Sequence, residues 1–129
     1  MNAAIARYFD EIEACLIASP AIASYQILRR EIAPSDGKLR IKAKLSDGGM
    51  AELFEYVAET SGQIAAHKYS FQWQDAQGTL VRRWDNAPHH KELANAPHHS
   101  HEPDGSSKSA AETMNMQKVI EEIEKSVAR

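Results

Sequence analysis

Residues 39–45 read Leu39-Arg40-Ile41-Lys42-Ala43-Lys44-Leu45, a strict alternation of apolar and basic side chains. Successive side chains of a β-strand point to opposite faces of a sheet, so this period of two predicts a strand with one buried and one solvated face. The buried face is expected to carry Leu39, Ile41, Ala43 and Leu45. The solvated face is expected to carry Arg40, Lys42 and Lys44.

Segments with the same period lie on both sides of this strand, at residues 25–33, 50–59, 64–74 and 79–85. The breaks between them are rich in Gly, Pro, Asp and Ser, which tolerate the backbone dihedrals of turns. Short loops join neighbouring antiparallel strands, so we predict a five-stranded antiparallel meander. In the fourth strand the alternation places His67 on the same face as Tyr69, Phe71 and Trp73.

An N-terminal helix over residues 2–18 is predicted by apolar residues that recur at steps of three and four. Asn2 can cap its start, and Ser19-Pro20 ends it. This helix is the natural cover for the apolar face of the sheet, which gives an α+β fold. The single cysteine, Cys15, lies within the helical pattern and excludes an intramolecular disulfide. We interpret it as an inert thiol, with a reactive nucleophile as the alternative.

The C-terminal part is predicted to be a linker at residues 103–110 and an amphipathic helix at residues 111–129, following one α+β domain at residues 1–102. Residues 109–112 match a capping box. The apolar stripe of the helix consists of Met116, Ile120, Ile123 and Val127. This stripe can pack on its own domain, or it can complete an interface with a second copy or another protein. We favour the intermolecular role, which would make the chain a homo-oligomer or part of a complex.

Length and charge limit the function classes. A chain of 129 residues fits one domain. The net charge of −3 gives no general attraction to nucleic acid, so any basic surface must be local. No segment resembles a secretion signal or a membrane span, and we therefore expect a cytoplasmic protein without a membrane partner.

Histidines are concentrated near the end of the last predicted strand. Five of the six lie within a short segment, at His89, His90, His98, His99 and His101. The pentapeptide Asn-Ala-Pro-His-His occurs twice there, and each proline disfavours helix for the residue before it. The segment is therefore expected to be an ordered loop without regular structure.

Three interpretations of this segment follow. Two imidazoles can act as general base and general acid on a phosphodiester, because histidine exchanges protons near neutral pH. His98 and His101, or a pair from the two His-His motifs, can instead bind a divalent metal such as zinc or nickel, with help from Glu102 or Asp85. In the third interpretation the histidines only make structural contacts in the loop.

Basic residues nearby suit phosphate chemistry. Arg82 and Arg83 should lie on opposite faces of the fifth strand, where guanidinium groups can bind phosphate. Trp84 can stack on an unpaired base, or it can be a core residue. The solvated side chains of residues 40, 42 and 44 can follow an RNA backbone, or they can be an ordinary surface.

Several strings in the sequence resemble the TumE family of small toxins from toxin–antitoxin pairs. They occupy residues 26–31, 36–41, 53–56, 68–73 and 82–90, the last reading Arg-Arg-Trp-Asp-Asn-Ala-Pro-His-His, with a continuation at 97–101. The resemblance covers roughly residues 25–102. It implies a toxin that is neutralised by a cognate antitoxin protein, usually encoded beside it.

Residues and resemblance together favour a metal-independent endoribonuclease toxin without a cofactor. The catalytic candidates are His89, His90, His98 and His99, with Arg82 and Arg83 stabilising phosphate charge. RNA would be bound by Arg40, Lys42, Lys44 and Trp84. The alternatives are a non-enzymatic regulatory module that binds a partner, and a metal-dependent nuclease that uses His98 and His101.

Overall fold

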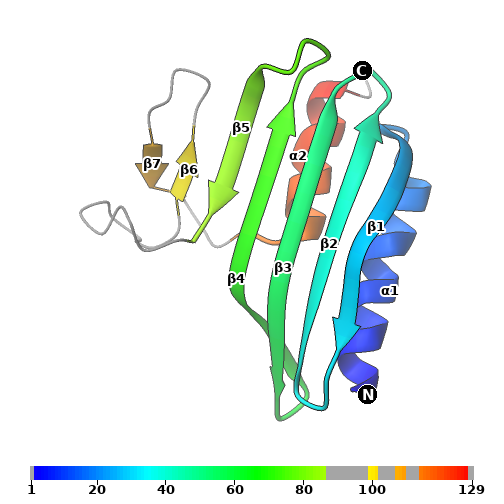
Figure 1. The fold of residues 1–129 in the computed structure, drawn as a ribbon, viewed down its shortest axis with the longest axis vertical. Helices are drawn as coiled ribbons and strands as arrows, with labels where there is room; N and C mark the ends of the chain where they lie inside the picture. Colours follow the sequence, from blue (N-terminus) through cyan, green and yellow to red (C-terminus); the bar gives the residue numbers. More distant parts are fainter. Residues whose placement is uncertain (1, 87–98, 102–106, 110–113, 128–129) are drawn as a thin grey trace.

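The computed structural model describes residues 2–86, 99–101, 107–109 and 114–127. Its elements are α1 (Ala3–Ala18), β1 (Ile22–Ile32), β2 (Asp36–Leu45), β3 (Met50–Thr60), β4 (Gln63–Gln74), β5 (Leu80–Asp85), β6 (His99–His101), β7 (Ser107–Ser109) and α2 (Met116–Val127). The strands pair in chain order, each antiparallel to the next, in one sheet (Figure 1). The predicted α+β fold with its meander of β1 to β5 is confirmed.

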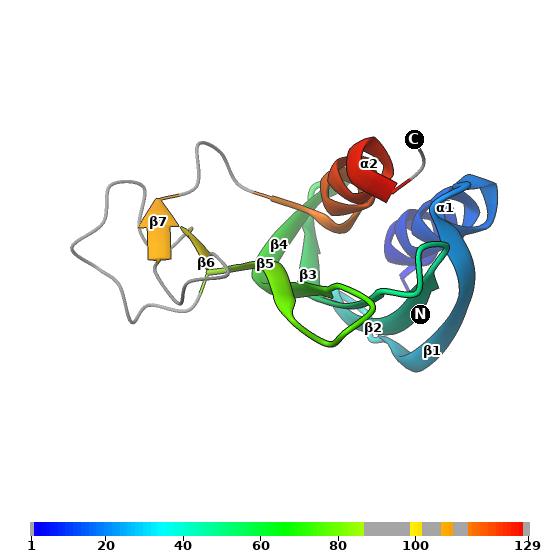
Figure 2. The same cartoon turned by 90° about the horizontal axis from the view of Figure 1, so that it is seen from above.

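Both helices cover the same face of the sheet, as the view from above shows (Figure 2). The side chain of Asn2 accepts a hydrogen bond from the Ile5 amide at 3.0 Å and so caps α1. The helix buries Ile5, Phe9, Ile12 and Leu16. Against them lie the buried residues of β2, which are Leu39, Ile41, Ala43 and Leu45. The predicted orientation of this strand is therefore confirmed.

The helix α2 packs on the same core rather than extending away from it. Its buried residues are Met116, Val119, Ile120 and Ile123, and Val127 packs against them at the end. The intermolecular docking that we favoured from the sequence gives way to an intramolecular one, because this domain already covers the apolar stripe. The helix begins at Met116, and the side chain of Asn115 accepts from the Lys118 amide at 2.9 Å. Ser109, the predicted cap, belongs to β7 instead, and residues 110–112 lie outside the described residues.

Two short strands extend the meander where loops were expected. His99–His101 forms β6 and pairs with β5, and Ser107–Ser109 forms β7 within the segment predicted to be a linker. The expectation of a loop without regular structure is therefore wrong for residues 99–101. The rest of the histidine-rich segment, residues 87–98, lies outside the described residues.

His67 is on the opposite face from the one predicted. Tyr56 pairs with Lys68 while Val57 pairs with Ala66, so an extra residue is inserted in β4 at this point. A β-bulge of this kind changes the alternation of side chains. His67 is consequently exposed, with its ring centroid 6.2 Å from that of Tyr56. Within the described part of the chain, no helix is long and apolar enough to cross a membrane.

Candidate nucleic-acid interface

The sheet face opposite the two helices, which we call the open face, carries the basic side chains of β2. Arg40 is half-buried there, and Lys42 and Lys44 are exposed. Because α1 and α2 both lie behind the sheet, no helix described here covers this face (Figures 1 and 2). The open face is therefore the surface on which a large ligand can lie.

A groove of about 540 Å³ crosses this face over β1 to β4, and we call it the basic groove. Its charged and aromatic lining consists of Arg29, Lys38, Arg40, Lys68, Phe54 and Tyr56. The lining holds four cations and no carboxylate. A volume of this size lies within the range of ~300–1,000 Å³ that is usual for ligand sites.

Nearby carboxylates neutralise part of this charge. Arg29 forms an ion pair with Glu31, and the hydrogen bond from Arg29 lowers the pKa of the Glu31 carboxyl. Nη1 of Arg40 lies 3.0 Å from Oε2 of Glu52. The Arg40 guanidinium carbon is also 4.5 Å from the ring centroid of Phe54, which is only 8% exposed. Phe54 thus supports the guanidinium group from below.

Tyr56 lies between the two lysines of the groove. Lys38 and Lys68 are its register partners on β2 and β4, and Nζ of Lys38 is 5.5 Å from the ring centroid. The Tyr56 hydroxyl donates to Oδ2 of Asp36 at 2.8 Å, and this hydrogen bond raises the pKa of the phenol. Neither lysine forms an ion pair with a residue that the structure describes. Glu31 is the register partner of Lys38 on β1, and the Lys38 charge helps to lower the pKa of that carboxyl, so the charge of Lys38 is partly offset there. Both ammonium groups still line the groove, where an anionic ligand can reach them.

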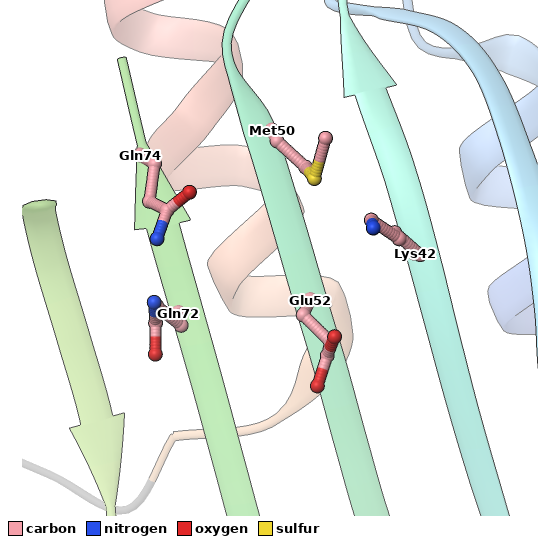
Figure 3. A pocket seen from close by; sticks show the side chains of 5 residues that line it. All are labelled: Lys42, Met50, Glu52, Gln72 and Gln74. Atoms are coloured by element: carbon pink, nitrogen blue, oxygen red, sulfur yellow. The ribbon is translucent and has the colours of Figure 1, made fainter. Parts of the chain in front are cut away.

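A second, smaller pocket of about 260 Å³ lies beside the groove on the open face (Figure 3). It is lined by Lys42, Met50, Glu52, Gln72 and Gln74. The Arg40–Glu52 ion pair lies at the boundary, because Arg40 lines the groove and Glu52 lines the pocket. Of the three predicted RNA-binding residues of β2, Arg40 and Lys42 therefore lie in neighbouring depressions, and Lys44 lines neither.

The strand register connects the groove to the histidine-rich segment. One row of backbone partners runs from Arg40 through Phe54, Ser70 and Asp85 to His99. Two rows further along the same strand pair, Arg83 is opposite His101. The backbone of the two histidines is thus placed next to the last long strand of the sheet.

The side chains of β5 divide between the two faces, as expected. Arg83 lies opposite Gln72 in register, and its Nε is 3.3 Å from Oδ2 of the buried Asp85. Arg82 is on the helix side, with its guanidinium carbon 4.9 Å from the ring centroid of Trp84. Trp84 is a core residue, 2% exposed, so its ring offers no surface on which a base can stack.

The other predicted site residues are not placed by the structure. His89, His90 and His98 lie outside the described residues, and only the backbone of His99 and His101 is described. Within the described part of the chain, no group of three or more histidine, cysteine or carboxylate side chains could hold a metal ion. The metal-dependent alternative, with His98 and His101, therefore remains a prediction.

Six residues of the groove were missed by sequence reasoning: Arg29, Lys38, Phe54, Tyr56, Lys68 and Ser70. Lys38 extends the alternation of β2 by one step, and this signal could have been used. Arg29 reaches the open face through a register shift between Ile27 and Arg29. Such irregularities, and the pairing of distant strands, cannot be read from local periodicity.

Comparison with protein families matches the model described as toxin TumE over residues 12–127, from the middle of α1 to the end of α2. The chain belongs to the TumE toxin family. The match extends beyond the resemblance at residues 25–102 and includes the C-terminal part of α1 and the whole of α2. Membership supports a toxin role. No curated protein and no solved structure matches the chain.

Proposed function

We propose that this TumE-family toxin is a metal-independent endoribonuclease whose catalytic groups belong to the histidine-rich segment beside β5. The observation that carries the proposal is the register of β6, which sets the backbone of His99 opposite Asp85 and that of His101 opposite Arg83. A histidine-bearing strand therefore adjoins a cationic residue of the open face. The family supplies the toxin role, and many small toxins of such pairs act on RNA.

The reaction needs a base, an acid and a cation. One imidazole, from among His89, His90, His98 and His99, removes the proton of a ribose 2′-hydroxyl, whose oxygen then attacks the adjacent phosphorus. A second imidazolium gives its proton to the 5′-oxygen as the P–O bond breaks. The products are a 2′,3′-cyclic phosphate and a free 5′-hydroxyl, and no metal or redox partner is consumed.

Arg83 is better placed than Arg82 to stabilise the phosphate. Its side chain is 44% exposed on the open face, whereas the Arg82 guanidinium stacks against Trp84 on the helix side. A guanidinium group can donate two hydrogen bonds to the non-bridging oxygens as negative charge develops on them. Asp85 orients Arg83 through their ion pair.

The direct test is cleavage of an end-labelled single-stranded RNA by the purified full-length chain in excess EDTA. We expect cleavage that leaves 2′,3′-cyclic phosphate ends, and a loss of ~10²–10⁴-fold in rate for His90→Ala or His99→Ala. His67→Ala is the matched control, because it removes an exposed histidine outside the segment. Cleavage that requires added zinc would replace the proposal with the metal-dependent alternative.

Growth provides a second test. Induced expression without the cognate antitoxin should stop growth, and the two histidine variants should not. If the wild-type chain stops growth but cleaves no RNA, the endoribonuclease proposal is wrong.

A further inference from the structure

We propose that the basic groove binds single-stranded RNA, with a base stacked on the Arg40 guanidinium group and phosphates held by Lys38 and Lys68. The choice of RNA as the occupant rests on the proposed endoribonuclease function. The site itself is distinct from the histidine-rich segment, since it lies on β1 to β4.

The phosphate contacts follow from the two lysines. They flank Tyr56 in one register row, so their backbones are two strand spacings, or ~10 Å, apart. Both line the groove, and neither forms an ion pair with a described residue. Ammonium groups at this separation that form no ion pair within the described part of the chain suit successive anionic groups of a flexible chain, because each can displace counterions from a phosphate.

The base contact follows from the stacking of Arg40 on Phe54. The guanidinium carbon of Arg40 lies over the Phe54 ring, 4.5 Å from its centroid, and Arg40 also lines the groove. The ion pair with Glu52 holds the group in this orientation. A planar cation fixed in this way is a platform for an unpaired base, and stacking of this kind tolerates any base.

Two features favour a single strand over a duplex or an acidic protein. Bases within a duplex are stacked on one another and cannot lie on a guanidinium plane. An acidic peptide could pair with the cations of the groove, but its carboxylates would not use the flat surface of the Arg40 guanidinium group beside Tyr56. A planar base can use both the charge and that surface. The row from Arg40 to His99 spans four strand spacings, or ~19 Å, so a strand of a few nucleotides can reach the proposed catalytic segment.

Binding can be measured without cleavage by fluorescence anisotropy of a labelled 2′-O-methyl oligonucleotide, which lacks the attacking hydroxyl. For the full-length Lys38→Gln/Lys68→Gln variant we expect at least tenfold weaker binding at low salt. The slope of log K against log salt should fall by ~1.4, because each single-strand phosphate contact contributes ~0.7. Lys125→Gln, which removes an exposed charge from α2, is the control and should bind as the wild type does.

Arg40→Lys separates stacking from charge. The lysine keeps the charge but has no plane, so we expect weaker binding with an unchanged salt slope. Wild-type affinity in Arg40→Lys, or equal losses in the double variant and Lys125→Gln, would overturn the proposal. Equal affinity for a duplex of the same sequence would also overturn the proposal. So would groove variants that bind RNA as the wild type does but no longer bind the antitoxin.

The two proposals fail in different ways. If RNA affinity falls in the groove variants but the wild type cleaves no RNA, the proposal for the basic groove is supported and the endoribonuclease proposal is contradicted. If cleavage depends on the histidines but RNA affinity is unchanged in the groove variants, only the proposal that the basic groove binds RNA is contradicted.

Discussion

Glu55 is a carboxylate fully buried between β3 and the two helices. Its Oε1 accepts a hydrogen bond from the Tyr8 hydroxyl at 2.6 Å, and its Oε2 accepts one from the Met116 amide at 2.7 Å. It therefore joins α1 to the first turn of α2, where the amide groups have no partner within the helix. Alternation in β3 places Glu55 between Leu53 and Val57, a signal of a carboxylate on the buried face that our sequence analysis did not use. Its two partners could not be foreseen, because they come from residues 47 and 61 positions away.

Glu55→Ala should lower the free energy of unfolding by ~2–4 kcal/mol, because it leaves the Tyr8 hydroxyl and the Met116 amide unpaired in the core and creates a cavity. Glu55→Gln keeps an oxygen for the amide, and its NH₂ group can donate to the tyrosine hydroxyl. We expect its stability at neutral pH to equal or exceed that of the wild type. Urea unfolding measures both, and equal losses in the two variants would show that the charge itself is required.

The same residue predicts a dependence of stability on pH. Burial raises the pKa of the Glu55 carboxyl, and the two hydrogen bonds oppose that rise without cancelling it. The Glu55 carboxyl therefore stays protonated to higher pH in the folded state than in the unfolded state. As pH rises from the unfolded pKa to the folded pKa, and beyond it, this group lowers the free energy of unfolding. The stability advantage of Glu55→Gln over the wild type should thus be larger at about pH 8 than at about pH 4. A constant difference between the two proteins would contradict the raised pKa.

The elements themselves were predictable to different degrees. The meander followed from alternation and turn residues, because each long strand has one buried face. β6 and β7 could not be predicted, since three residues give no periodicity, and the pairing of β6 with β5 and of β7 with β6 depends on the rest of the sheet. The apolar stripe of α2 was visible, but the surface that covers it was not, because amphipathicity does not distinguish a domain's own core from a partner.

The packing of α2 gives a prediction at the scale of the element. Ile123→Ala removes a fully buried side chain and should lower the free energy of unfolding by ~2–5 kcal/mol, with no change in molecular mass by light scattering. Val127→Ala, at the partly buried end of the same stripe, should cost less. A smaller mass for Ile123→Ala without a loss of stability would show that the stripe contacts a second copy instead.

At the scale of the whole molecule, a cationic groove and an acidic pocket lie on opposite sides of the sheet. The lining of the basic groove has four cations, although the net charge of the chain is −3. On the other side, Glu121 and Glu124 line a pocket with Cys15 between the helices. Burial is the main cause that raises the pKa of the Cys15 thiol, and the two glutamates add to it. A protonated thiol agrees with our interpretation of Cys15 as inert.

This separation predicts that RNA binding follows local rather than net charge. Neutralising Glu121 and Glu124 together, by substitution with Gln, makes the net charge less negative by two units. These side chains lie beyond the sheet from the groove, and at physiological salt charges interact over only ~8 Å. The affinity for the 2′-O-methyl oligonucleotide should therefore change by less than about twofold at that salt concentration. If binding instead strengthens as much as it weakens in Lys38→Gln/Lys68→Gln, RNA responds to the overall charge, and the groove has no special role.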